Sequence, residues 1–152
     1  MRLRRESEYG LNGLVTLAQE GVGKVMSLDE IAARHRLPKS FLAKIFVKFV
    51  HHGLVRSFRG SVRGYALARS PRQITLREIL ESIEGPDLFE QCIFWSNRCS
   101  DHNPCPLHTG WSVVRPRLIE IAEQTTLASL ARDQVEQTPV RRQHRNVRRN
   151  TG

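Results

Sequence analysis

The segment from Ser27 to Ala68 constrains the fold more than any other part of the chain. Ser27-Leu28-Asp29-Glu30 is a capping box, with a hydroxyl at the N-cap and a carboxylate at N3, and it predicts the start of a short helix. Leu37-Pro38 interrupts this helix, and Pro38 is well placed as the first residue of the next one. The second helix is predicted from apolar residues that repeat at helical spacing: Leu42, Ile45, Phe46, Phe49 and Val50.

A short basic hairpin is predicted directly after these two helices. Gly53 is suited to end the second helix, and strands are expected at Leu54–Phe58 and Tyr65–Ala68 around two turn glycines. The hairpin carries three cations: Arg56, Arg59 and Arg63. Two helices, a tight turn and a hairpin in this order form the pattern of a winged helix-turn-helix, which places its second helix in the major groove of double-stranded DNA.

The residues opposite the apolar stripe of the second helix are the candidate DNA contacts. They are Lys39, Ser40, Ala43, Lys44, Val47 and Lys48, and the three polar residues nearest the helix start suit base edges best. The hairpin cations are placed to reach the adjacent minor groove. A solvated helix face is the alternative interpretation. The chain has a net charge of +9, and 20 of its 24 cations are Arg, which suits phosphate and guanine recognition.

The remaining elements predict a mainly α fold. Ser7 is expected to cap a first helix with Leu11, Leu14, Val15 and Ala18 on its apolar face, and Thr75-Leu76-Arg77-Glu78 is a second capping box. The chain turns helical again from Trp111 to about Arg132, where Pro116 either kinks the helix or marks its first turn. We expect a DNA-binding domain at 1–85, a cysteine loop at 86–110, a dimerisation helix at 111–132 and a disordered basic tail at 133–152.

Length and hydropathy limit the class of protein further. A chain of 152 residues is expected to form one compact domain with appendages, which argues against most large enzyme scaffolds. No stretch approaches the roughly 18 apolar residues that span a membrane, and the basic residues at the start are not followed by an apolar signal core. We therefore expect a cytoplasmic protein without a membrane partner and without catalytic residues.

Three cysteines and a histidine form the second constellation, with the spacing C-x6-C-x5-C-x2-H. Cys92, Cys99, Cys105 and His108 all lie in a stretch without helical or strand periodicity, where a loop is free to wrap around a metal ion. An odd number of cysteines argues against a disulfide framework. Spacing alone leaves zinc, an iron–sulfur cluster and unligated thiols open. A nucleophilic thiol with His102 or His108 as base is a further alternative, but nothing else in the sequence indicates a substrate pocket.

Several stretches together resemble one known family. They are Met1-Arg2-Leu3, Ser27 to Ala32, Pro38 to Leu42, Gly53 to Gly60, Gly64 to Ala68, Ile74 to Leu80, Ile83-Glu84-Gly85, Pro104 to His108 and Thr125-Thr126-Leu127. In these stretches the chain is similar to the bacterial winged-helix regulators typified by IscR, NsrR and RirA. The likeness covers about residues 1 to 132.

The resemblance implies a homodimeric transcription regulator that binds a palindromic promoter site and dimerises through Trp111 to Gln124. It also implies that Cys92, Cys99 and Cys105 bind a 2Fe-2S or 4Fe-4S cluster whose state alters DNA binding. His108 matches the fourth ligand of IscR-type members. Glu8 matches the position at which NsrR-type members contribute an aspartate from the other subunit.

The sequence departs from the family pattern at three places. Six residues separate the first two cysteines where IscR-like members have five, Arg63 replaces a usual glycine of the hairpin, and Ala43 lacks a carboxylate that some members carry. The resemblance predicts a regulator that senses iron, redox or nitric oxide status through its cluster. A cluster-free family member that responds to thiol oxidation or a small-molecule effector is the alternative. A small thiol-dependent enzyme is the alternative from another class.

Overall fold

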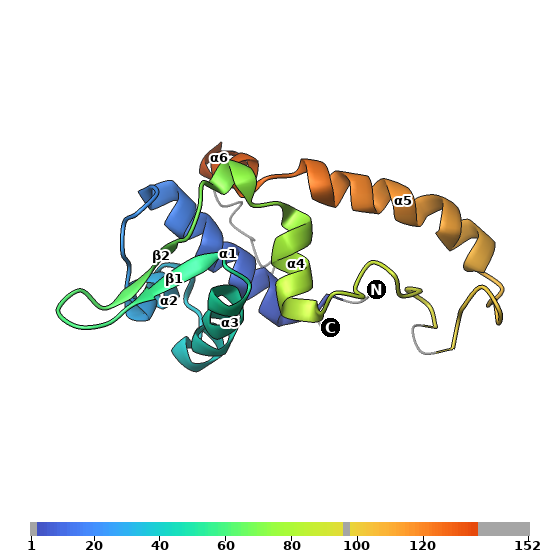
Figure 1. The fold of residues 1–152 in the computed structure, drawn as a ribbon, viewed down its shortest axis with the longest axis horizontal. Helices are drawn as coiled ribbons and strands as arrows, with labels where there is room; N and C mark the ends of the chain where they lie inside the picture. Colours follow the sequence, from blue (N-terminus) through green and yellow to red (C-terminus); the bar gives the residue numbers. More distant parts are fainter. Residues whose placement is uncertain (1–2, 96–97, 137–152) are drawn as a thin grey trace, which may run out of the picture.

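The computed structural model describes residues 3–95 and 98–136, and it confirms the predicted mainly α architecture with one small hairpin (Figure 1). The elements in chain order are α1 (Arg5–Glu20), α2 (Leu28–His35), α3 (Lys39–His51), β1 (Val55–Phe58), β2 (Gly64–Leu67), η1 (Pro71–Gln73), α4 (Leu76–Glu84), α5 (His108–Gln124) and α6 (Leu127–Glu136). The two strands pair antiparallel, with Val55 opposite Leu67 and Phe58 opposite Gly64. Both capping boxes form as predicted, at α2 and at α4.

The main core surrounds α1, which contacts α3, α4 and α6. Its largest fully buried side chains include Leu14, Ile31, Leu42, Phe46, Phe49, Ile79 and Leu127. Two glycines let α1 approach its neighbours closely. A Cβ on Gly10 would lie 2.7 Å from Ile83 Cδ1, and a Cβ on Gly13 would lie 2.8 Å from Phe46 Cε2. Helix propensity disfavours glycine at these positions, and close packing explains its presence.

Two details of the predicted helices are wrong. α1 begins at Arg5 with Arg4 as its N-cap, so Ser7 is not the cap; the Ser7 hydroxyl is buried and donates to Glu84 Oε1 at 2.5 Å. Val50 is 40% exposed, although its spacing placed it on the apolar stripe of α3. It lies about 100° around the helix from Phe49, which is buried, and so falls outside the stripe that packs on the core.

The single helix expected from Trp111 to Arg132 is also wrong, because the structure has two helices there. α5 starts three residues earlier, at His108, and Pro116 lies inside it. The break falls at Thr125-Thr126, whose backbone pairs with the segment before α4: Leu76 N–H donates to Thr125 O, and Leu127 N–H donates to Ile74 O, each at 2.8 Å. Thr126 Oγ1 then accepts from Ser129 N–H, which begins a new helix.

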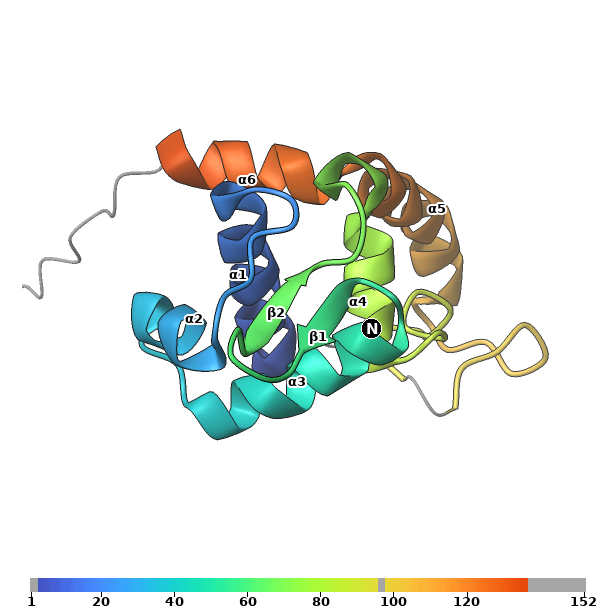
Figure 2. The ribbon, with the colours of Figure 1, turned by 60° about the vertical axis from the view of Figure 1, so that its left-hand side comes forward.

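After the break, α6 crosses α1 and packs into the main core, as Figure 2 shows. Most of α5 and the cysteine loop instead extend away from the DNA-binding domain as an arm (Figure 1). A second small core joins this arm to α4 through Leu80, Leu88, Phe89 and Ala122. The arm is therefore fixed at its root, while its far end carries the cysteines.

None of the helices in the described ranges is both long enough and apolar enough to cross a membrane. The predicted basic tail at 133–152 lies mainly outside the described residues, which end at 136.

The hairpin is attached to the domain at Gly64. Met26 and Tyr65 exchange two backbone hydrogen bonds of 2.8 and 2.9 Å, and a Cβ on Gly64 would lie 2.2 Å from Met26 O. We therefore expect Gly64→Ala to destabilise the protein by about 2 kcal/mol, because the backbone must shift to relieve the contact. Thermal or urea unfolding measures this loss.

Gly110→Ala is the matched control, since its Cβ would meet open space within α5. It should leave stability unchanged or raise it slightly, because alanine is the better helix former. If the Gly64→Ala variant were as stable as the parent, the close contact between Gly64 and Met26 would be contradicted. Arg63, which stands where the family usually has a glycine, is exposed beside the contact between Gly64 and Met26. The close contact therefore requires glycine at Gly64 and not at Arg63.

Candidate metal centre and DNA interface

The structure brings the three predicted cysteines together at the far end of the arm. Their Sγ atoms all lie within 4.8 Å of one another, and Cys92 Sγ is 3.9 Å from Cys105 Sγ. Cys92 is buried, and Cys99 and Cys105 are half-buried. Two thiolates on one tetrahedral zinc or iron ion, with bonds near 2.3 Å, lie about 3.8 Å apart. The donors therefore fit a thiolate-bound metal centre.

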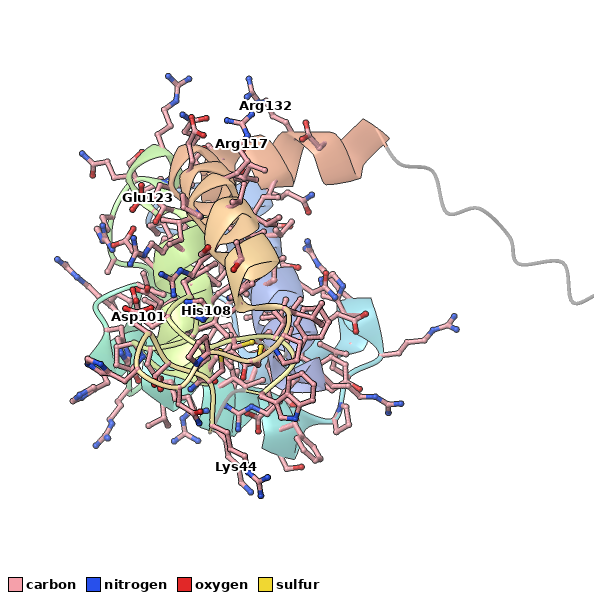
Figure 3. All side chains as sticks on the ribbon, turned by 90° about the vertical axis from the view of Figure 1, so that its right-hand side faces the viewer. Lys44, Asp101, His108, Arg117, Glu123 and Arg132 are labelled. Carbon is pink, nitrogen blue, oxygen red and sulfur yellow. The ribbon has the colours of Figure 1, made fainter. Side chains whose placement is uncertain are left out.

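His108, the first residue of α5, joins the site through its ring. Its Nδ1 is 3.2 Å from Cys99 Sγ, and its Nε2 is 3.3 Å from Asp101 Oδ1. Figure 3 shows Asp101 of the cysteine loop beside His108 at the start of α5. A histidine that ligates a metal through one ring nitrogen commonly donates its other N–H to a carboxylate. Asp101 is not among the site residues predicted from the sequence, because an exposed acid in a loop gives no periodic signal.

The local environment shifts the pKa values of Cys92 and Cys105 in opposite directions. Hydrogen bonds from the Trp95 and Phe94 backbone N–H groups lower the pKa of Cys92, because they stabilise its thiolate. Burial raises the pKa of Cys105. Cys92 is thus the thiol of this pair that loses its proton first, and a deprotonated sulfur is the form that binds metal.

A pocket of about 270 Å³ opens beside the cysteines. Its lining includes Cys92, Cys99, His108, Trp111 and Arg115. Among the described residues, the indole Nε1 of Trp111 is the only buried side-chain nitrogen or oxygen without a hydrogen-bond partner. Arg115 donates to Glu90 O at 3.2 Å and so connects α5 to the loop.

Glu8, the alternative fourth ligand, is exposed on α1. Within the described part of this chain, the group of potential metal ligands consists of the three cysteines. His108 lies outside this group but contacts Cys99, and Glu8 is not part of it. Its proposed role needs a second subunit.

The candidate DNA contacts occupy the opposite end of the molecule. Lys39, Ser40 and Lys44 are exposed along α3, and Ala43 between them is half-buried. Lys44 projects from the edge of the molecule in Figure 3. Arg56, Arg59 and Arg63 are exposed on the hairpin. A groove of about 440 Å³ runs between the starts of α2 and α3 and the hairpin, with Lys39, Arg59 and Arg63 in its lining.

Two of the predicted contacts have partners within the chain. Lys39 Nζ lies 2.7 Å from Asp29 Oδ2, an exposed ion pair that joins the starts of α2 and α3. Lys48 is half-buried; its Nζ donates to Ile83 O at 3.1 Å and lies 3.5 Å from Glu6 Oε2. The structure therefore directs Lys48 toward α1 and α4, whereas Lys44 is exposed to solvent.

A winged helix-turn-helix domain joined to a long helix and a cysteine loop defines a DNA-binding transcription regulator. The chain belongs to the Rrf2 family, described as iron-dependent transcriptional regulators, whose model matches residues 3–133. It is 29% identical to the HTH-type transcriptional regulator CymR of Bacillus subtilis over 131 residues, which cover 86% of this chain and 90% of CymR.

Two solved structures have the same fold. The global cysteine regulator CymR of B. subtilis superimposes with a TM-score of 0.73 at 26% identity, covering 88% of this chain and 98% of that one. IscR of T. potens superimposes with a TM-score of 0.68 at 26% identity, covering 91% of this chain and 93% of that one. The predicted family and the function as a transcription regulator are confirmed.

Proposed function

We propose that this regulator senses iron, redox or nitric oxide status through an iron–sulfur cluster held by Cys92, Cys99, Cys105 and His108. The observation that carries the proposal is the convergence of three thiols and an imidazole that are spread over 17 residues of loop and helix start. The description of the family as iron-dependent and the likeness to IscR of T. potens support it.

The four donors fall into two pairs, Cys92 with Cys105 and Cys99 with His108. All three sulfurs also lie within 4.8 Å of one another, and this donor set suits an iron–sulfur cluster of the 2Fe-2S or the 4Fe-4S type. Such a centre, when bound, supplies a redox-active group that oxidants and iron supply alter. The protein's part is to hold the Cys92 thiolate with backbone N–H groups and to orient the His108 ring with Asp101.

The exposed apolar residues of the arm support a homodimer built on α5. Val113, Val114 and Ile121 are 74%, 54% and 47% exposed on α5, which is more apolar surface than an isolated soluble helix normally presents. A second copy related by a two-fold axis buries such a face against itself. The dimer then presents two α3 helices, which matches a palindromic DNA site.

Anaerobic reconstitution with iron and sulfide tests the proposal. We expect visible absorption with stoichiometric iron and sulfide, and a DNA affinity that differs between the holo and apo proteins. The DNA probe is a duplex selected from a randomised pool by the parent protein. A colourless protein with zinc or free thiols, and DNA binding that responds to thiol oxidation, would support the cluster-free alternative instead.

The fourth ligand is predicted to be His108. His108→Ala should change the cluster spectrum and shorten the cluster lifetime in air more than Glu8→Ala does, because the His108 ring already contacts Cys99 and Asp101. Optical spectra and the rate of bleaching measure both properties. A Glu8→Ala variant with a changed spectrum, beside an unchanged His108→Ala variant, would assign the ligand to the partner subunit's first helix.

A further inference from the structure

Lys48 connects α3, the predicted DNA-recognition helix, to the end of α4. Its Nζ donates to the carbonyl of Ile83 at 3.1 Å and pairs with Glu6 at 3.5 Å. Ile83 lies in the last turn of α4, where backbone carbonyls lack partners within the helix and where cations are favourable. The Lys48 side chain therefore supplies a hydrogen-bond partner to a carbonyl at the end of α4. Lys48 lies one helical turn beyond Lys44 on α3.

A second cation reaches the same carbonyl. Arg4 Nη2 donates to Ile83 O at 3.0 Å, while Arg4 Nε donates to Glu84 Oε2 at 2.8 Å. The Glu84 side chain is only 5% exposed and also accepts from Ser7 Oγ and from Arg4 N–H. We call Arg4, Glu6, Lys48 and Glu84, together with the Ile83 carbonyl, the Ile83 junction.

The charges of the Ile83 junction are balanced. Two cations and two carboxylates meet there, and burial opposes the charge of Glu84 while hydrogen bonds from Ser7 and Arg4 hold its pKa below the usual value. Such a network of hydrogen-bonded charges fixes the relative positions of the helices that contribute to it. The Ile83 junction joins the start of α1, the second half of α3 and the last turn of α4.

The Ile83 junction lies between the two functional ends of the molecule. In one direction, α3 leads from Lys48 back to Lys44 and Ser40 on the exposed face. In the other, the chain leaves α4 at Gly85 and passes through Leu88 and Phe89 of the second core before it reaches Cys92. These packed side chains form the route by which a displacement of the cysteine loop would reach the end of α4.

We propose that Lys48 is the positioning residue through which the state of the cysteine loop sets the placement of the recognition helix on DNA. The inference rests on the proposed function, because it takes the cysteine loop to be the sensor. It assigns to Lys48 a coupling role in place of a DNA contact. In this role Lys48 acts through the Ile83 carbonyl, to which its Nζ donates.

The test compares Lys48→Met with two other lysine variants in the full-length protein. For each we measure the affinity of the holo and apo forms for the selected duplex. Lys48→Met should move the ratio of the two affinities at least about threefold toward one, since couplings of this kind are typically 5- to 150-fold. Lys44→Met should weaken both forms and leave the ratio unchanged. Lys24→Met, in an exposed pair with Glu20, should change neither.

A second measurement does not depend on a cluster. By reciprocity, DNA must alter the cysteine loop if the loop alters DNA binding. We expect the selected duplex to change the alkylation rate of Cys99 in the apo parent, and this effect to be lost in Lys48→Met and regained in Lys48→Arg. Arginine restores a cation that can donate to the carbonyl, and circular dichroism checks that each variant folds.

The outcomes separate the two proposals. A colourless parent in which DNA still changes alkylation through Lys48 would keep the coupling and remove the cluster. A coloured parent whose affinity ratio survives Lys48→Met would keep the cluster and overturn the coupling. A parent in which DNA leaves thiol reactivity unchanged overturns the coupling as well.

Discussion

A Cys99→Ala variant should fail to hold a stable chromophore after anaerobic reconstitution while it keeps its helical fold. Cys99 is the thiol next to His108, with Sγ 3.2 Å from Nδ1, and its sulfur also accepts from Cys105 N–H. Removing it breaks one donor pair and leaves too few thiolates for a cluster. The core that holds α1, α3 and α4 does not include the cysteine loop, so circular dichroism should change little. Visible spectra and iron and sulfide analysis measure the loss.

Ser112→Ala is the matched control for this variant. Ser112 lines the same pocket, and its hydroxyl donates to Thr109 O, so the substitution alters the pocket without removing a sulfur. It should retain the chromophore in full. We expect Cys92→Ala and Cys105→Ala to behave like Cys99→Ala. Full iron and sulfide occupancy in the Cys99→Ala protein would show that the convergence of the three thiols serves another purpose, such as thiol oxidation.

Local sequence signals predicted most of the DNA-binding domain. The capping boxes at Ser27 and Thr75 mark the starts of α2 and α4, and the apolar spacing of α3 identifies its buried residues up to Phe49. These signals succeed because each depends on residues within one or two turns. The start of α1 failed for the opposite reason: the hydroxyl of Ser7 is used by Glu84, which lies 77 positions away.

The break between α5 and α6 depends on a similar long-range contact. Thr125 and Thr126 pair with the backbone before α4, and no local pattern around them contains that partner. Gly10 and Gly13 read locally as weak helix formers, although their role is to let α1 approach α3 and α4. The sequence therefore predicts which segments are helical better than it predicts where tertiary contacts end them.

The candidate site was predictable to the extent that its residues are close in sequence. Cys92, Cys99, Cys105 and His108 share one stretch, and the structure brings them together. The sequence grouped Lys48 with the DNA contacts because it lies on the polar side of α3. Its partners at Ile83 and Glu6 come from α4 and α1, so only the tertiary structure separates Lys48 from Lys44.

The basic surface should account for most of the DNA affinity. Lys44→Ala and Arg59→Ala should each weaken binding to the selected duplex by about 1 to 3 kcal/mol, because we expect Lys44 to face the major groove and Arg59 to reach the minor groove. Both side chains are exposed on separate elements, so their effects should add, and the double variant should bind about 30-fold more weakly or worse. Fluorescence anisotropy over a range of salt concentrations measures these changes.

The salt dependence distinguishes a base contact from a phosphate contact. A lysine or arginine that binds only phosphate should reduce the slope of log K against log salt by about one and weaken all duplexes alike, whereas a base contact should also relax the preference for the selected sequence. Lys24→Ala is the control, since Lys24 carries the same charge but pairs with Glu20 beyond the end of α1. If the Lys44→Ala and Arg59→Ala proteins bound the selected duplex as tightly as the control, α3 and the hairpin would be solvated surfaces, and the DNA would have to contact another part of the protein.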